Sequence, residues 1–207
     1  MSTITRIVQQ KDQNRANIYL DGKFAFGITL EALLKNSLHV NKELSVQHVT
    51  KLKEEDNQAK IINRAIEFAI RRPHSQKEIE LWFRRKKVED TVQGVALNKL
   101  KKLGLVDDLS FAKWWIDQRN TFRPKPEKVI KLELRQKGVS VDIIEEASEG
   151  SEVLDELQTA RKVIARKIDR YKKMPYGVGK KKLSNFLAMR GFSWEIIRQI
   201  IDEYIKK

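Results

Sequence analysis

The sequence feature that most constrains the fold is a seven-residue motif that occurs three times. Its clearest copy is LRQKGVS at residues 134–140, and a second copy, LAMRGFS, lies at residues 187–193. A weaker copy, FRRKKVE, lies upstream at residues 83–89. Successive copies are 51 and 53 residues apart, and Pro73 and Pro124 repeat with the first of these spacings. A period near fifty residues, with prolines at matching points, predicts tandem supersecondary units and not one mixed core.

Each copy of the motif has the composition of a joint between two helices. Gly138 and Gly191 follow basic amphipathic stretches, and glycine most easily adopts the left-handed conformation that closes a helix. Two residues later, Ser140 and Ser193 are suited to cap the first turn of a new helix. The upstream copy has Lys87 at the glycine position, so we predict a lysine with a positive φ there. With a further helix before each proline, every unit is predicted to be a three-helix module.

The N-terminal part of the chain has a different pattern. Between residues 4 and 28, apolar and polar residues alternate in three runs, and Asp21 and Gly22 form a hairpin turn signal between two of them. This predicts a small β-sheet that lies entirely before residue 30. Two helices are expected to follow, one capped by Thr29 and one by Ser45.

The remainder of the chain is predicted to be helical, with nine helices in residues 58–207 and no strand. A helix that begins near Gln58 should stop before Pro73, and a capping box that begins at Ser75 should open the next. One long helix is expected over residues 157–168. The predicted fold is therefore mainly α, with three tandem helix-turn-helix-like modules and an N-terminal β-sheet headpiece. The predicted parts are a headpiece at 1–57 and modules at 58–107, 108–150 and 151–207.

Composition narrows the class of protein. The chain has 207 residues, of which 41% are hydrophobic and 34% charged, and no apolar run reaches the roughly 20 residues of a membrane span. Cysteine is absent, which removes disulfides and thiolate chemistry and suits a reducing cytoplasm. The net charge is +14. We therefore expect a soluble cytoplasmic protein with an acidic partner, most often nucleic acid.

Positive charge is unevenly distributed along the predicted parts. The net charge is +1 in residues 1–57, +6 in 58–107, 0 in 108–150 and +7 in 151–207. Ordinary solvated helix surface is the alternative for any single cluster, but an excess shared by two modules favours a continuous binding surface. The candidate contacts to nucleic acid or a partner are Arg71, Arg72, Arg84, Arg85, Lys86, Lys87, Lys172, Lys173, Lys180, Lys181, Lys182 and Arg190.

No arrangement typical of an enzyme is found. The three histidines are far apart and match no metal or nucleophile pattern. GVGKK at residues 177–181 resembles a phosphate-binding loop, but it lacks the earlier glycine and the hydroxyl residue after the lysine, so we predict a turn before a basic helix. Asp107 and Asp108 are predicted to cap the first helix of the second module, at a module joint, and Trp114 is the tryptophan expected to face outward. We predict no catalytic residue, no metal and no cofactor.

Several of these segments resemble a known family, the RecX recombination regulators. LGLVDD and VIKLELRQKGV are similar to the central signature of the family, RGFS resembles its later repeat, and the N-terminal runs resemble the extension of Gram-positive-type members. These segments lie at residues 103–108, 111–112, 129–139, 190–193, 4–7 and 18–27. Two departures are Lys87, where the family usually has glycine, and a further C-terminal repeat of some members that has no counterpart here.

The resemblance implies a non-enzymatic modulator of the RecA recombinase. Members of the family bind RecA filaments on single-stranded DNA, block their extension, and lower ATP hydrolysis, strand exchange and co-protease activity, which places them in DNA repair and the SOS response. For this chain we accordingly expect a RecA filament as the partner, with weak or filament-associated binding to single-stranded DNA, no membrane and a monomeric state. The alternative from the residues alone is a stand-alone helix-turn-helix DNA-binding protein.

Overall fold

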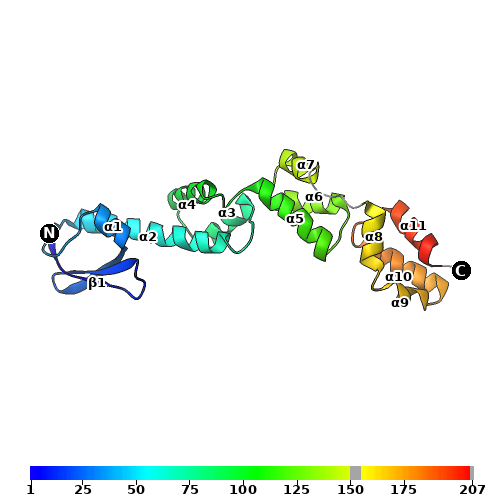
Figure 1. Cartoon of the computed structure of the whole chain (residues 1–207), viewed down its shortest axis with the longest axis horizontal. Coiled ribbons are helices and arrows are strands. Elements are labelled where there is room, and N and C mark those ends of the chain that lie inside the picture. Colours follow the sequence, from blue (N-terminus) through cyan, green and yellow to red (C-terminus); the bar gives the residue numbers. More distant parts are fainter. Residues whose placement is uncertain (150–154, 206–207) are drawn as a thin grey trace. The chain divides into compact units, whose positions relative to one another are not determined.

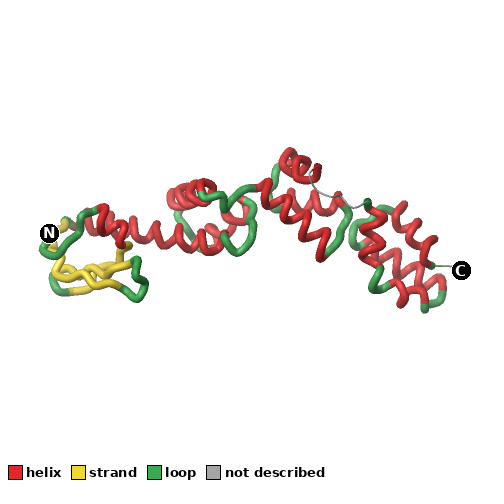
Figure 2. The backbone as a smooth tube through the Cα atoms, in the orientation of Figure 1, coloured by secondary structure: helices red, strands yellow, loops and turns green. Residues whose placement is uncertain are grey.

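The computed structural model describes residues 1–149 and 155–205 of the chain. Figure 1 shows the elements in chain order, and Figure 2 shows that the strands are confined to the N-terminal part and that helices make up the rest. The chain forms two compact units, one of residues 1–68 with 88–99 and the other of residues 69–87 with the chain from residue 100 onward. The mainly helical fold with an N-terminal sheet is as predicted, and no described residue beyond position 60 lies in a strand.

The headpiece is built on a four-stranded antiparallel sheet in the order β3-β2-β1-β4. Asp21 and Gly22, with φ of 51° and 82°, form the predicted turn between β2 and β3. The sheet does not end before residue 30, as the sequence had suggested, because Leu44 in β4 pairs with Ser2 in β1. A two-residue strand is too short to show alternation, so only its tertiary pairing reveals it. The strands are β1 (Ser2–Gln9), β2 (Arg15–Leu20), β3 (Lys23–Thr29) and β4 (Glu43–Leu44).

Two helices complete the first part of the chain. The short α1 (Leu30–Lys35) is capped by Thr29, as predicted, and α2 (Val46–Ala69) is a single helix of 24 residues. A new helix was expected to begin near Gln58, but no proline or glycine interrupts this stretch. Asp56 is buried at the expected break, where its carboxylate pairs with Arg15 at 2.6 Å.

Helices α3 to α11 follow, so ten helices, α2 to α11, extend beyond residue 58 in the part of the chain that the structure describes, and not the nine predicted. The expected long helix over 157–168 is split into α8 and α9. Gly179 of α10 lies against α9 so closely that a Cβ there would be 2.6 Å from the Tyr171 carbonyl oxygen. The helices are α3 (Gln76–Arg85), α4 (Asp90–Lys102), α5 (Asp108–Phe122), α6 (Glu127–Gln136), α7 (Val141–Glu149), α8 (Glu156–Ile164), α9 (Ile168–Lys172), α10 (Tyr176–Ala188) and α11 (Trp194–Tyr204).

The second unit contains two apolar cores, each formed by one set of consecutive helices. Helices α5 to α7, here called the second module, enclose Phe111, Leu134 and Ile144. Helices α8 to α11, the third module, enclose Leu183 and Ile200 together with the remaining buried residues of their cluster. Separate cores of this kind are the packing expected of tandem repeats.

The repeated motif forms the joint that the sequence predicted. Gly138 and Gly191 both have φ of 86°, in the turns after α6 and α10, and Lys87 has φ of 53° in the turn after α3. Lysine therefore takes a conformation that is unfavourable for any residue with a Cβ. The apolar residues that follow the two glycines, Val139 and Phe192, are buried as expected.

Candidate functional site

The N-terminus of α3 is joined to the second module by polar contacts. The Ser75 hydroxyl donates to the Lys137 carbonyl at 2.7 Å and accepts from the Glu78 backbone N–H at 3.2 Å. The Gln76 backbone N–H donates to the Asp108 carboxylate at 2.8 Å. Asp107 caps α5, as predicted, whereas the Asp108 carboxylate caps α3 and not the helix that it was predicted to cap. We call this set of contacts the first joint.

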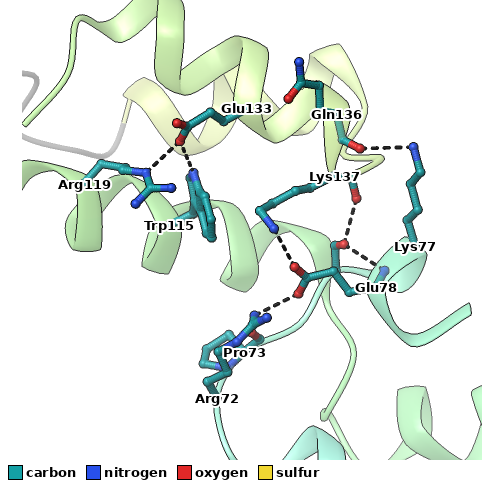
Figure 3. Close-up of polar contacts among 10 residues, drawn as sticks. Arg72, Pro73, Lys77, Glu78, Trp115, Arg119, Glu133, Gln136 and Lys137 are labelled. Carbon is teal, nitrogen blue, oxygen red and sulfur yellow. Dashed lines mark hydrogen bonds and ion pairs between the residues drawn. The ribbon is translucent and has the colours of Figure 1, made fainter. Parts of the chain in front are cut away.

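The capping box predicted at Ser75 is half formed. Its serine side caps α3, but the Glu78 carboxylate accepts from Arg72 at 2.8 Å and from Lys137 at 2.6 Å (Figure 3). Burial alone would raise the pKa of Glu78, yet the hydrogen bonds from these two cations outweigh it and hold that pKa below its ordinary value. Arg72, one of the predicted contact residues, is thus engaged in holding the fold.

A second ion cluster lies inside the second module. Glu133 of α6 accepts from Trp115 Nε1 at 2.9 Å and from Arg119 Nε at 2.7 Å (Figure 3), and it also pairs with Lys125. Burial tends to raise the pKa of Glu133, but hydrogen bonds from Lys125, Arg119 and Trp115 lower it below its usual range. Part of this module's positive charge is therefore neutralised within the module itself.

The cations predicted at the end of α3 stay on the surface. Arg84, Arg85, Lys86 and Lys87 are all exposed, and no ion pair to them occurs among the described residues. Arg71, before α3, is exposed as well. None of these side chains is paired with a carboxylate among the described residues that an anionic partner would have to displace, and Arg85 Nε donates to the Leu81 carbonyl at 3.4 Å.

The other predicted cluster is gathered on the third module. Lys172 and Lys173 lie at the end of α9, and Lys180, Lys181 and Lys182 lie on α10, which packs against α9. All five are exposed. Residues 177–181 form part of the first turns of α10 and not a turn before it, because Pro175 already opens the helix. The phosphate-loop resemblance has no structural counterpart.

Arg190, the last predicted contact, differs from these lysines. It is half-buried, and its guanidinium lies 3.9 Å from the centre of the Phe186 ring. It lines a groove of about 1530 Å³ between the second and third modules. Six cations line this basic groove, against one carboxylate, Asp117, among the described residues. The cations are Lys113, Arg123, Lys125, Lys162, Arg166 and Arg190.

Sequence reasoning missed five of the six cations in the basic groove. Three of them, Lys113, Arg123 and Lys125, belong to the segment whose net charge is zero, so a count along the chain hides them. Two exposed apolar residues, Phe122 and Met189, also line the groove.

The expectation for the tryptophans needs correction. Trp114 is half-buried, because its ring packs against Phe111 with 6.0 Å between ring centres. Trp194, at the start of α11, is 68% exposed and is the tryptophan that faces outward. As the first residue of a helix that follows a tight turn, it has few neighbours to cover it.

The described helices include none with the length and apolarity needed to cross a membrane. Within the same residues, no three His, Cys, Asp or Glu side chains are grouped as metal ligands would be. Of the predicted contact residues, the structure places eleven on exposed or half-buried surface where a ligand can reach them and commits Arg72 to the first joint.

Comparison with known proteins agrees with this architecture. Residues 2–45 match the N-terminal domain of the regulatory protein RecX, and residues 107–147 and 155–201 match its second and third three-helix domains. The RecX protein of Leuconostoc mesenteroides is 31% identical over 99% of this chain and 77% of its own length, and that of Bacillus subtilis is 29% identical over 98% and 77%.

Solved structures show the same likeness. A crystal structure of the regulatory protein RecX has a TM-score of 0.72 and 26% identity, and it covers 98% of this chain and all of its own. RecX from Lactobacillus salivarius has a TM-score of 0.58 and 26% identity over 72% of this chain and 97% of its own. The matched domains, the curated relatives and the repeat structure together show that this chain belongs to the RecX family of regulatory proteins.

Proposed function

We propose that this protein regulates recombination by binding RecA filaments on single-stranded DNA and inhibiting their activity. Membership of the RecX family carries this proposal, since the chain matches relatives named as regulatory proteins over nearly its whole length. It acts by binding, with no chemistry of its own. Inhibition of the recombinase lowers its ATP hydrolysis, strand exchange and co-protease function in the cytoplasm, and so regulates DNA repair and the SOS response.

The distribution of charge supports this assignment. The exposed cations after α3 and on α9 and α10 offer an anionic partner two sets of contacts on separate repeats. Phosphates of a nucleoprotein filament are one such partner, and contacts to them position a protein without reading sequence. A repeat array presents an extended surface, which suits a partner that is itself a repeating polymer.

The test compares a preformed recombinase filament with bare DNA. The protein is titrated against the ATPase of the filament and, separately, against the same single strand alone, at about 50 and about 200 mM salt. We expect inhibition of the ATPase at concentrations well below those needed to bind the bare strand. Equal or tighter binding to bare DNA, without inhibition, would instead establish the stand-alone DNA-binding protein.

Charge-matched variants locate the contacts. Arg84→Glu/Arg85→Glu and Lys180→Glu/Lys182→Glu each change the net charge by the same amount as Lys51→Glu/Lys53→Glu, whose two lysines are exposed on α2. The first two variants should weaken filament inhibition, and the salt slope should fall by roughly 0.7 for each lost phosphate contact on single strands. The third serves as the control. Identical behaviour of all three variants would mean that both clusters are ordinary solvated surface.

A further inference from the structure

We propose that the basic groove between the second and third modules is a binding site for single-stranded nucleic acid, in which the cations hold phosphates and Phe122 stacks on a base. None of its central residues belongs to the clusters used above. The inference goes beyond the proposed function, because it assigns a single strand to a groove that lies outside those clusters. The groove residues come from α5, the loop after it, α8 and the turn after α10.

Four cations of the basic groove carry charge that is not compensated by a carboxylate in the described part of the chain. Lys113, Arg123, Lys162 and Arg166 are exposed, and no carboxylate among the described residues lies within ion-pair distance of any of them. Lys125 differs, because Glu133 already neutralises it. Four unpaired cations around one hollow, with a single carboxylate beside them, repel one another until an anion enters.

Apolar surface lies beside these charges. Phe122, at the end of α5, is 71% exposed, and Met189, after α10, is 88% exposed. An exposed aromatic ring within a cationic groove is the usual platform for a base of a single strand, since every base has a π-face. In a duplex the faces of the bases are covered by their neighbours, so the ring would find no partner there.

Contacts within the fold hold part of the groove in place. Arg190 lies with its guanidinium on the Phe186 ring and its Nη1 bonded to the Phe186 carbonyl at 3.5 Å, so its charge is fixed at the floor. The adjacent Gly191 lies against Val129 of α6. The hollow is thus bounded by packed residues on one side and by exposed side chains on the other. Such a site accepts a flexible polyanion of variable sequence.

The experiment measures binding of the full chain to a labelled oligothymidine of about 16 nucleotides by fluorescence anisotropy, with no recombinase present. Arg123→Glu/Arg166→Glu is compared with Lys51→Glu/Lys53→Glu, which changes the net charge equally in the other unit. We expect the groove variant to weaken binding about tenfold or more and to lower the salt slope by about 1.4, twice the value for one single-strand contact. The control should change binding less than about threefold.

A second pair of variants tests stacking. Phe122→Ala should weaken oligothymidine binding about fivefold or more, since one stacked base contributes at least about that much. The control is Phe24→Ala, which removes a phenylalanine that is 60% exposed in the headpiece and should have little effect. All six side chains changed in these two pairs of variants are exposed, so the variants should fold, and far-ultraviolet circular dichroism checks this. If Arg123→Glu/Arg166→Glu is unfolded, Lys113→Glu/Lys162→Glu provides a second charge reversal in the groove.

Three outcomes overturn the inference. Equal losses in the groove variant and its control would mean that net charge alone binds the strand. Equal affinity for a hairpin duplex, with no effect of Phe122→Ala, would remove the single strand as the ligand. Competition by polyglutamate as strong as that by unlabelled oligonucleotide would assign the groove to an acidic protein segment. Filament inhibition is measured on the same variants, so the regulatory proposal can fail or hold independently.

Discussion

The two joints between successive repeats have the same geometry but different chemistry. At the first joint, a Cβ on Gly138 would lie 2.7 Å from the Lys77 side chain of α3. At the second joint, between α6 and the turn after α10, a Cβ on Gly191 would lie 2.4 Å from Val129 Cγ2. In both joints, the glycine with positive φ in one module packs on the first turn of a helix of the preceding module. The repeated motif itself therefore determines how one module packs on the next.

What differs is the residue before each of those first turns. Ser75 precedes α3 and donates its hydroxyl to the next module, whereas Pro126 stands at the matching point before α6 and has no hydroxyl. Partly buried hydrogen bonds and ion pairs surround the first joint, and the basic groove opens beside the second. One repeated contact thus serves stability in the first case and leaves room for a ligand in the second.

Gly191→Ala should give the largest effect and test the second joint. The φ of 86° and the contact with Val129 together predict a loss of about 2–3 kcal/mol in the free energy of unfolding. Urea denaturation measures it. Adding Val129→Ala should restore part of the loss, because the added methyl then has space. Gly94→Ala, on α4 with nothing within 4 Å of the new Cβ, is the control and should stabilise by about 0.5–1 kcal/mol. A harmless Gly191→Ala would mean that the second joint is not packed as described.

Ser75→Ala should break the first joint. The variant removes the cap of α3 and leaves the Lys137 carbonyl without its donor, which costs about 2 kcal/mol. Pro126→Ser makes the converse change at the second joint. There, a gain from the new cap is offset by a looser unfolded chain, so we expect a change within about 0.5 kcal/mol. Urea midpoints of the two variants compare the joints directly, and equal effects would remove the chemical distinction between them.

Acid should weaken the first joint through Glu78. Because the folded pKa of Glu78 lies below its ordinary value, its stabilisation is complete above the unfolded pKa of about 4.3 and is lost as the pH falls through the lower folded pKa. Glu78→Gln removes this dependence. We expect the wild-type chain to lose more stability than the variant between about pH 6 and pH 3. Parallel pH profiles of unfolding would show that the pairs with Arg72 and Lys137 contribute nothing.

Lys87→Gly should have the smallest effect and has the opposite sign. Glycine relieves the strain of φ 53° but loosens the unfolded chain, which leaves a net gain of about 0.5–1 kcal/mol. Lys86→Gly is the matched control, because Lys86 has a negative φ of −86° and glycine there should destabilise. A loss of stability in Lys87→Gly would show that the lysine side chain makes a contact that outweighs its strain.

Most of the fold could be predicted from the repeated motif. Gly138, Gly191 and Lys87 marked three helix ends correctly, because a left-handed residue is a local requirement that a short segment meets by itself. The break between α8 and α9 was missed, since Ala165 to Lys167 contain no residue that stops a helix and tertiary packing decides it. The cap at Ser193 was also wrong, for its hydroxyl makes no cap bond and its backbone N–H donates to Glu156 at 2.8 Å.

The candidate site was less accessible to sequence reasoning. Runs such as Lys180 to Lys182 are visible as clusters because their members are neighbours in the chain. The basic groove draws Arg123 and Arg166 from segments some forty residues apart, and Arg123 belongs to a module whose total charge is zero. Only the packing of one module on the next brings such residues together, so a count of charge along the chain gives no warning of them.

The uninterrupted α2 has a consequence for which changes in length the protein can accept. Leu52 and Ala65 are both buried along this one helix, so their relative direction is set by 100° of rotation per residue. Insertion of one residue between them would turn Ala65 away from its buried position. An insertion of seven would return it to within about 20° of the same face and lengthen the helix by about 10.5 Å. Indels in this segment should therefore be tolerated in steps of whole helical turns, unlike those in a surface loop.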